Sequence, residues 1–257
     1  MNRAGRRAAL RRACGAIALC AQAIGAVPAR AEVWAYIDRD GRAHFATRQL
    51  DDRYQLFFKG GSSLDPPRSD ATQAEARAAL MRSPLYRRVV DHPNARRYAP
   101  LIERHASVNS LDAALLKAMI AVESGYDPAA VSDKGAIGLM QVMPETGERY
   151  GVAADVRQSV VQKLMDPATN GRIGARYLRD LLKLFAGDRT LALAAYNAGE
   201  QAVMKYGNQV PPYPETRDYV ELVRQFEVLY RPPPAPRPPP ARPALELPGK
   251  GAARPPA

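Results

Sequence analysis

The sequence predicts a mainly α-helical protein with a short β-hairpin before the helices and a disordered tail after them. Three observations support this fold class. Apolar residues with helical spacing and good helix formers run from about residue 69 to 230. Residues 32–46 form two β-rich runs around an Asp40-Gly41 turn, which is typical of a hairpin. In the last 27 residues lie 11 of the chain's 23 prolines, with almost no large apolar side chain.

Residues 1–31 have the composition of a secretory signal peptide. An arginine-rich start is followed by a small and apolar run, and the segment ends at Ala29-Arg30-Ala31, an A-x-A cleavage pattern. The run is too short and too rich in alanine and glycine for a membrane span, which needs about 20 strongly apolar residues. We therefore expect export, and a mature protein that works in the periplasm.

Both cysteines, Cys14 and Cys20, lie inside this expected signal peptide. The mature chain would then contain no cysteine and form no disulfide. The residues before Cys20 resemble a lipoprotein cleavage box, but Leu19 stands where a small residue would be expected. Lipidation is therefore disfavoured, and association with the outer membrane stays open.

The net charge of +11 is concentrated at the two ends of the chain. The expected signal peptide contributes six positive charges and no acid, and residues 231–257 contribute five positive charges and one acid, which leaves roughly +1 for the body between them. A nucleic-acid-binding protein needs a basic face on its folded part, so no nucleic-acid partner is expected. The tail is predicted to be inert, with weak contact to wall polymers or a membrane as the alternative.

The hairpin is expected to serve as a packing or spacer element rather than as a ligand site. An isolated two-stranded hairpin is only marginally stable in water, so this one should lean on the helical part. Glycine, serine and proline residues at positions 60–67 predict a linker. The hairpin and linker together make up a module over residues 32–68.

The helical part is expected to span residues 69–230. Ser110 is the predicted N-cap of a helix over 111–124. Asp166 and Pro167 have the pattern of an N-cap followed by proline at the first helical position, and that helix should end near Gly187. The other predicted helices cover residues 69–82, 98–105, 190–197 and 216–230.

Glu123 is the candidate catalytic residue. On a helix over 111–124 it falls between Leu116 and Met119, at the edge of an apolar stripe, and Lys117 lies about a third of a turn away. Desolvation should raise the pKa of such a carboxyl group, which would let it act as a general acid. From the helix alone, however, a glutamate that turns into solvent is the favoured interpretation.

The motifs that follow reverse this interpretation. Glu123-Ser124 is followed in order by Gly-Leu-Met-Gln-Val-Met-Pro at 138–144, Ala-Tyr-Asn-Ala-Gly at 195–199 and Glu-Thr-Arg-Asp-Tyr-Val at 215–220. This arrangement resembles the catalytic domain of the soluble lytic transglycosylase family, relatives of goose-type lysozyme. The four motifs span about 100 residues, and the resemblance covers about residues 95–230. It implies a lysozyme-like helical catalytic domain.

The resemblance implies cleavage of peptidoglycan glycan strands. Family members cut the β-1,4 bond between N-acetylmuramic acid and N-acetylglucosamine and leave a 1,6-anhydro ring. One carboxyl group, here Glu123, would act first as the acid and then as the base. Glycosidases ordinarily use two carboxylates, and Asp127 and Asp133 fit better as turn or capping residues. The enzyme is expected to be monomeric.

Six further residues match substrate-site positions of the family. Ser132 and Gln141 would line the sugar cleft, and Met143 would pack near the catalytic glutamate. Tyr196 and Asn197 would hold the N-acetyl region of the substrate. Tyr219 would hydrogen-bond near the acid. The alternatives are that Met140 and Met143 belong only to the core, and that Glu215 is an ordinary charge at a helix N-terminus.

Two other functions remain open at this point. One is a muramidase on the same fold, which would admit water, and the other is a wall-binding or secretion-assembly protein without turnover. A zinc enzyme is disfavoured, because His44, His92 and His105 are far apart in sequence and lack a ligand motif. No metal and no cofactor are expected.

Overall fold

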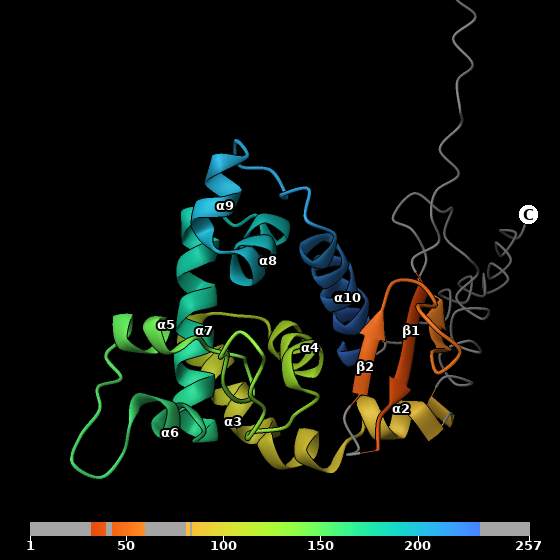
Figure 1. Cartoon of the computed structure of the whole chain (residues 1–257), viewed down its shortest axis with the longest axis horizontal. Helices are drawn as coiled ribbons and strands as arrows, with labels where there is room; N and C mark the ends of the chain where they lie inside the picture. The colour runs from red at the N-terminus through yellow and green to blue at the C-terminus, as the bar shows by residue number, and fades with distance from the viewer. Residues whose placement is uncertain (1–31, 40–42, 60–80, 83, 232–257) are drawn as a thin grey trace, which may run out of the picture.

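A computed structural model describes residues 32–39, 43–59, 81–82 and 84–231 (Figure 1). The expected signal peptide, the linker at 60–67, most of the predicted helix 69–82 and the proline-rich tail beyond Arg231 lie outside the described residues. Within the described ranges, the helices are all too short or too polar to cross a membrane.

The N-terminal module is a small antiparallel sheet. Its strands are β1 (Glu32–Ile37), β2 (Ala43–Ala46) and β3 (Gln55–Lys59), in the order β2-β1-β3. The predicted hairpin corresponds to β1 and β2. The third strand was not predicted, although Leu56-Phe57-Phe58 is an apolar run of the kind that forms strands.

The rest of the described chain is helical, as predicted. Helices of ten to eighteen residues are accompanied by short ones of five or six residues. The helices are α2 (Pro84–Val89), α3 (Pro93–Asn109), α4 (Ala113–Ser124), α5 (Pro144–Arg149), α6 (Val160–Leu164), α7 (Pro167–Leu184), α8 (Arg189–Ala198), α9 (Glu200–Lys205) and α10 (Pro214–Tyr230).

The start of α4 differs from the prediction. Asp112 is its N-cap, and Oδ1 of Asp112 accepts a hydrogen bond from Ala114 N at 2.8 Å. Ser110 instead ends α3 in the left-handed conformation, with φ 55° and its N–H directed to Ala106 O and Ser107 O. The predicted cap at Ser110 is therefore wrong, because serine and aspartate both favour N-cap positions and only one of two nearby residues takes the role.

The predicted start of α7 is confirmed. Oδ2 of Asp166 accepts a hydrogen bond from Thr169 N at 2.8 Å, and Pro167 is the first helical residue. The helix ends at Leu184, shortly before Gly187, which has φ +87°.

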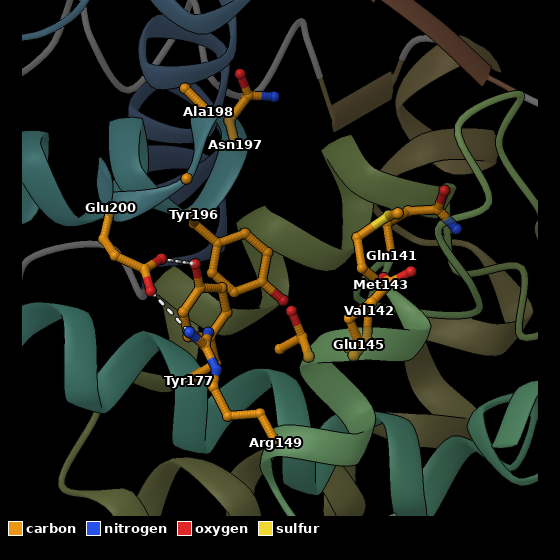
Figure 2. Close-up of a pocket in the computed structure, with 12 residues that line it drawn as sticks. Gln141, Val142, Met143, Glu145, Arg149, Tyr177, Tyr196, Asn197, Ala198 and Glu200 are labelled. Carbon is orange, nitrogen blue, oxygen red and sulfur yellow. Dashed lines mark hydrogen bonds and ion pairs between the residues drawn. The ribbon is translucent and has the colours of Figure 1, made fainter. Parts of the chain in front are cut away.

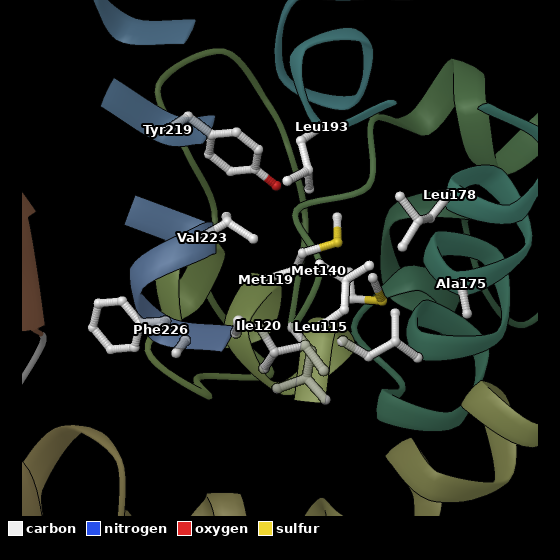
Figure 3. Packing of buried hydrophobic residues seen from close by; sticks show 14 of the residues in the cluster. Leu115, Met119, Ile120, Met140, Ala175, Leu178, Leu193, Tyr219, Val223 and Phe226 are labelled. Atoms are coloured by element: carbon white, nitrogen blue, oxygen red, sulfur yellow. The ribbon is translucent and has the colours of Figure 1, made fainter. Parts of the chain in front are cut away.

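Helix α4 lies at the centre of the molecule, packed along α10 on one side and against α3 on the other (Figure 1). Helix α8 packs against both α7 and α10. Figure 3 shows the buried side chains between these helices. Among them Leu115, Met119, Val223 and Phe226 are at most 1% exposed.

The sheet packs against the helical part, as expected for a module that cannot stand alone. Val33 and Ala35 on β1 are buried in the same core as α10. The rings of Phe45 and Phe57 lie 4.8 and 5.8 Å from the ring of Phe226 on α10. The sheet and helices therefore share one hydrophobic core.

Candidate active site

Helix α4 carries Glu123 at its C-terminal end. Leu116 and Met119 are fully buried on this helix, and Glu123 itself is half-buried. The helix ends at Ser124, and its C-cap is Gly125, which has φ 58°. Lys117, about a third of a turn away, pairs instead with Glu103 at 3.0 Å.

The surroundings of Glu123 favour its protonated form. Desolvation is the largest influence and raises the pKa of the carboxyl group from its ordinary 4.5 to about 8. The Tyr219 hydroxyl favours the ionised form and lowers the pKa, while the negative charge of Glu215 raises it. The balance leaves Glu123 mostly protonated at neutral pH.

Two tyrosines face this carboxyl group from different helices. Tyr219 lies on α10 and Tyr196 on α8, and burial followed by the charge of Glu123 raises the pKa of both phenols well above 10. Both therefore remain hydrogen-bond donors. The buried Tyr219 hydroxyl makes no hydrogen bond of ordinary length within the described part of the chain, so it is free to donate to an ionised Glu123 or to a substrate.

The loop after α4 is tied to the end of this helix. Oγ of Ser124 donates to Leu139 O at 2.9 Å, which links the residue after the candidate acid to the Gly-Leu-Met-Gln segment. Isolated β-bridges join Ile137 to Val131 and to Val142. Gly138 has φ +73°, and a Cβ there would lie 2.6 Å from Nδ2 of Asn170, so this position requires glycine.

A pocket of about 430 Å³ lies beside this loop (Figure 2). It contains four of the predicted site residues: Gln141, Met143, Tyr196 and Asn197. The other residues that line it come from α5, α7, α8 and α9 and from the turns beside them: Val142, Glu145, Thr146, Arg149, Tyr177, Ala198, Gly199 and Glu200.

Glu123, Tyr219 and Ser132 are not among the residues that line the pocket. Tyr196 connects the pocket with the surroundings of Glu123. It lines the pocket, and burial together with the charge of Glu123 raises the pKa of its phenol. Oγ of Ser132 accepts a hydrogen bond from Ala136 N at 3.0 Å, so this side chain organises its own loop. The pocket is thus a neighbour of the carboxyl group and does not enclose it.

Local contacts orient the pocket side chains. Nε2 of Gln141 donates to Gly138 O at 3.0 Å, and the Tyr196 hydroxyl donates to Met140 O at 2.9 Å. Oδ1 of Asn197 accepts from Oγ1 of Thr216 at 2.8 Å, which leaves the Asn197 amide nitrogen as the donor for a ligand.

The polar end of the pocket was not predicted. Nη1 of Arg149 donates to Oε1 of Glu200 at 2.7 Å, and the Tyr177 hydroxyl donates to Oε2 of Glu200 at 2.8 Å. The Arg149 guanidinium also lies 5.0 Å from the centre of the Tyr177 ring. Figure 2 shows this group on the side of Tyr196 opposite Gln141. Only the position of Glu200, directly after the Ala-Tyr-Asn-Ala-Gly motif, hinted at it in the sequence.

The structure assigns the other residues considered in the sequence analysis either to the pocket or to structural positions. Met140 is 1% exposed and belongs to the core, whereas Met143 is half-exposed at the pocket. Asp127 makes a turn, because its Oδ1 accepts from Ala129 N at 2.9 Å. Glu215 lies in the first turn of α10, as expected, and also pairs with Lys134 at 3.0 Å near enough to Glu123 to affect its pKa.

The histidines do not converge. Nε2 of His44 lies 2.7 Å from Oδ2 of Asp38, Nδ1 of His92 accepts a hydrogen bond from Asn94 N at the start of α3, and His105 lies within α3. Across the described residues, no three histidine, cysteine or acidic side chains come together as a metal site.

The chain is similar to known proteins over this region. Residues 100–217 match the family model described as "Transglycosylase SLT domain". The chain is 33% identical over 147 residues to the soluble lytic murein transglycosylase of Escherichia coli K12, which covers 52% of this chain and 23% of that protein. It is 34% identical over 120 residues to the membrane-bound lytic murein transglycosylase C of Haemophilus influenzae, with 43% and 34% covered.

A solved structure of a lytic transglycosylase from Pseudomonas aeruginosa has 31% sequence identity and a TM-score of 0.48, over 61% of this chain and 26% of that one. The chain thus matches about a quarter to a third of the length of these relatives. The family match contains Glu123 and the residues that line the pocket. Residues 100–217, slightly under half of the chain, are thus the part that is similar to the transglycosylase SLT domain family.

Proposed function

We propose that this chain is a lytic transglycosylase that cleaves the β-1,4 bond between N-acetylmuramic acid and N-acetylglucosamine in peptidoglycan and forms 1,6-anhydro-N-acetylmuramic acid. The observation that carries the proposal is the environment of Glu123. A desolvated carboxyl group with a pKa of about 8 stands next to a pocket large enough for a small ligand. The names of the related murein transglycosylases support the same substrate.

The first half of the reaction needs an acid. Glu123 is mostly protonated at neutral pH and donates its proton to the glycosidic oxygen, so the bond from that oxygen to the anomeric carbon breaks and the leaving sugar departs as an alcohol. The N-acetyl carbonyl of the muramic acid stabilises the electron-poor anomeric carbon. The amide of Asn197 is the candidate donor for orienting that N-acetyl group.

The second half needs a base. Glu123 is now ionised, and the Tyr219 hydroxyl favours this form. The carboxylate takes the proton from the C6 hydroxyl of the same sugar, whose oxygen closes the anhydro ring on the anomeric carbon. The proton count is balanced, because Glu123 ends protonated and no water is consumed. One carboxyl group is sufficient for both steps.

A hydrolase would ordinarily use a second carboxylate to activate water or to form a covalent intermediate. Among the described residues, Glu215 is the acid whose charge affects the Glu123 pKa, and it pairs with Lys134 at 3.0 Å. Asp127 caps a turn. This arrangement favours the transglycosylase over a muramidase on the same fold.

Product analysis tests the proposal. Purified peptidoglycan sacculi would be digested with the wild-type protein and with Glu123→Gln, and the fragments examined by mass spectrometry. We expect anhydro products from the wild type and none from Glu123→Gln. Fragments that are one water heavier, with reducing ends, would identify a muramidase. Binding to sacculi without release of fragments would identify a non-catalytic wall protein.

We also propose that residues 1–31 are an export signal, that the mature protein acts as a monomer in the periplasm, and that residues 231–257 form a tail with at most weak wall or membrane contact. The A-x-A pattern before Glu32 and the proline-rich composition of the tail support this. Mass determination of the protein from a periplasmic fraction would check the cleavage after Ala31. A full-length mass would contradict it.

A further inference from the structure

The N-terminal sheet contacts helix α10 at two positions along the helix axis. Just after β2, Oγ1 of Thr47 donates to Oδ1 of Asp218 at 2.7 Å. Further along the helix, the rings of Phe45 and Phe57 enclose the ring of Phe226, at 4.8 and 5.8 Å. One contact is polar and partly buried, and the other is apolar and belongs to the core.

These contacts bracket Tyr219. Asp218 is its neighbour in the chain, and Phe226 lies seven residues further, about 10 Å along the helix axis. Figure 3 shows Tyr219 and Val223 projecting from α10 toward the side where Met119 lies, whereas the ring of Phe226 projects to the other side of the helix and packs against Phe45 and Phe57 of the sheet. A helix that is contacted at two positions along its length cannot easily rotate about its axis or shift along it. The direction of the Tyr219 side chain is therefore fixed.

The hydroxyl of Tyr219 interacts with the carboxyl group of Glu123. This hydroxyl is buried and, within the described residues, makes no hydrogen bond of ordinary length. Its position beside Glu123 therefore depends on where α10 lies relative to α4. The two helices pack along each other, and the sheet supports α10. The sheet also comes close to the end of α4, since Ala43 N would lie 3.9 Å from a Cβ on Gly125.

We propose that Thr47 is a positioning residue of the active site: through its hydrogen bond to Asp218, the N-terminal sheet sets the placement of α10 and so holds the Tyr219 hydroxyl against Glu123. This inference rests on the proposed role of Glu123 as acid and base. It gives the β module a function beyond packing. The geometry at the catalytic carboxyl group then depends on a contact between Thr47 and Asp218, which are 171 residues apart in sequence.

Other groups also face Glu123, and their effects on its pKa must be distinguished from the effect of Tyr219. Glu215 lies on α10, with Lys134 paired to it from the loop after α4, and Tyr196 approaches from α8. A displaced α10 would move both Tyr219 and Glu215. These two act on the Glu123 pKa in opposite directions, since the Tyr219 hydroxyl lowers it and the Glu215 charge raises it. A Tyr219→Phe background removes the first influence and retains the second.

The experiment compares Thr47→Val, which keeps the shape and removes the hydroxyl, with Thr47→Ser, which keeps the hydroxyl. Asp51→Ala serves as the control within the same module, because Asp51 pairs with Arg53 there and is not the Thr47 contact on α10. For each variant the Glu123 carboxyl group is titrated by ¹³C NMR, with Glu123→Gln to assign its signal, and kcat and KM are measured on sacculi.

We expect Thr47→Val to shift the Glu123 pKa upward, in the direction of Tyr219→Phe, and to lower kcat about tenfold with KM changed less than about twofold. Thr47→Ser and Asp51→Ala should match the wild type. In the Tyr219→Phe background, Thr47→Val should cause no further upward shift. A merely structural role would lower the melting temperature and leave the Glu123 pKa unchanged.

Two results would overturn the inference: an unchanged Glu123 pKa in Thr47→Val, or an equal upward shift with and without Tyr219. The titration needs no turnover, so it is independent of the proposed reaction. If Glu123→Gln still cleaved sacculi, the proposed function would fail, and the titration would still decide whether Thr47 acts on Glu123 through Tyr219.

Discussion

Oδ1 of Asn170 accepts a hydrogen bond from Met140 N at 2.8 Å, and the same amide donates to Ile137 O and Leu164 O at 2.7 and 2.9 Å. The Asn170 side chain is completely buried on α7. A single amide therefore fixes the backbone just before Gln141, which lines the pocket. The path of the Gly-Leu-Met-Gln segment is determined as much by this asparagine as by the segment itself.

Replacing this amide should destabilise the protein. Asn170→Ala removes three hydrogen bonds and leaves their backbone partners buried, so we expect the free energy of unfolding to fall by about 2–4 kcal/mol. Urea denaturation followed by circular dichroism measures this. The exposed Gln209→Ala provides the control and should change the value by less than about 0.5 kcal/mol. Equal stability of the two variants would contradict the role of Asn170.

Gly138 is the second constraint on the same segment. A Cβ at this position would lie 2.6 Å from Nδ2 of Asn170 and 2.9 Å from Leu164 O, at φ +73°. Gly138→Ala should therefore cost more than about 3 kcal/mol in unfolding free energy. Gly151→Ala is the matched control, since Gly151 has φ +90° but no atom within 4 Å of the added Cβ. It should cost only the backbone strain, about 1–2 kcal/mol. Similar losses would show that the close approach to Asn170 is unimportant.

The long helices could be predicted from the sequence because their signals are local. Asp166-Pro167 marks the start of α7, and Glu123 falls on α4 next to the apolar positions from which its raised pKa was expected. The short helices α5, α6 and α9 have at most six residues each. A segment of fewer than two turns has no measurable helical periodicity, so these elements were not predicted.

The site was predictable where motifs exist and not elsewhere. Gln141 and Tyr196 were identified from the family resemblance and lie in one pocket. Arg149 and Glu200, at the polar end of that pocket, are 51 residues apart, and the hydrogen bond from Thr47 to Asp218 joins positions 171 apart. Pairings of this kind are set by tertiary packing and leave no local pattern in a single sequence.

The raised pKa of Glu123 should also appear in the stability of the protein. Because the pKa is 4.5 for an ordinary glutamate and about 8 in the folded protein, the folded state retains a proton that the unfolded chain loses between these pH values. The free energy of unfolding therefore falls as the pH rises from about 4.5 to about 8. Glu123→Gln removes this loss. At about pH 9 it should be more stable than the wild type by more than about 1 kcal/mol, and at about pH 4 nearly equal.

Thermal unfolding of wild type and Glu123→Gln across this pH range makes the comparison. Glu103→Gln is a suitable control, because Glu103 is exposed and its pair with Lys117 lies at the surface. A difference between Glu123→Gln and the wild type that does not vary with pH would mean that Glu123 titrates near its ordinary value.

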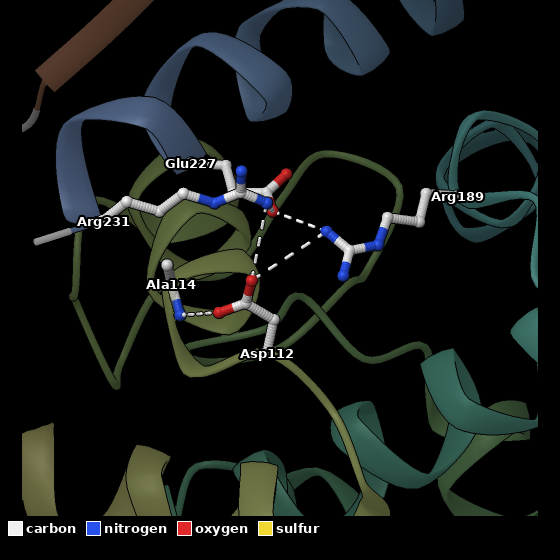
Figure 4. A network of polar contacts seen from close by, with 5 residues as sticks. All are labelled: Asp112, Ala114, Arg189, Glu227 and Arg231. Atoms are coloured by element: carbon white, nitrogen blue, oxygen red, sulfur yellow. Dashed lines mark hydrogen bonds and ion pairs between the residues drawn. The ribbon is translucent and has the colours of Figure 1, made fainter. Parts of the chain in front are cut away.

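A charged network joins the start of α4 to the end of α10 (Figure 4). Oε1 of the buried Glu227 accepts from Nη1 of Arg189 at 2.7 Å and from Nη2 of Arg231. Both arginines also lie within 4 Å of Asp112, the N-cap of α4. Glu227→Gln removes one of two negative charges between two arginines. We therefore expect the free energy of unfolding to fall by about 2 kcal/mol, a value that already allows for the partial exposure of the arginines.

Salt distinguishes this electrostatic effect from a packing defect. The loss caused by Glu227→Gln should shrink when the ionic strength is raised from about 0.05 M to about 1 M. Glu148→Gln, at an exposed position, should have little effect at either salt concentration. A loss that does not respond to salt would indicate that Glu227 acts through its hydrogen-bond geometry alone.

Thr216 should affect substrate binding through Asn197. Its hydroxyl donates to Oδ1 of Asn197, a residue that lines the pocket, at 2.8 Å and thereby fixes the orientation of the amide. Thr216→Val keeps the side-chain shape and removes the donor, so the Asn197 amide loses its fixed orientation. We expect KM for sacculi to rise about 3- to 10-fold, which corresponds to one hydrogen bond, with a smaller change in kcat. Thr216→Ser should restore the wild-type KM, and Asn197→Ala should abolish the difference between Thr216 and Thr216→Val. If Thr216→Val raised KM equally in the Asn197→Ala background, Thr216 would act on the substrate by another route.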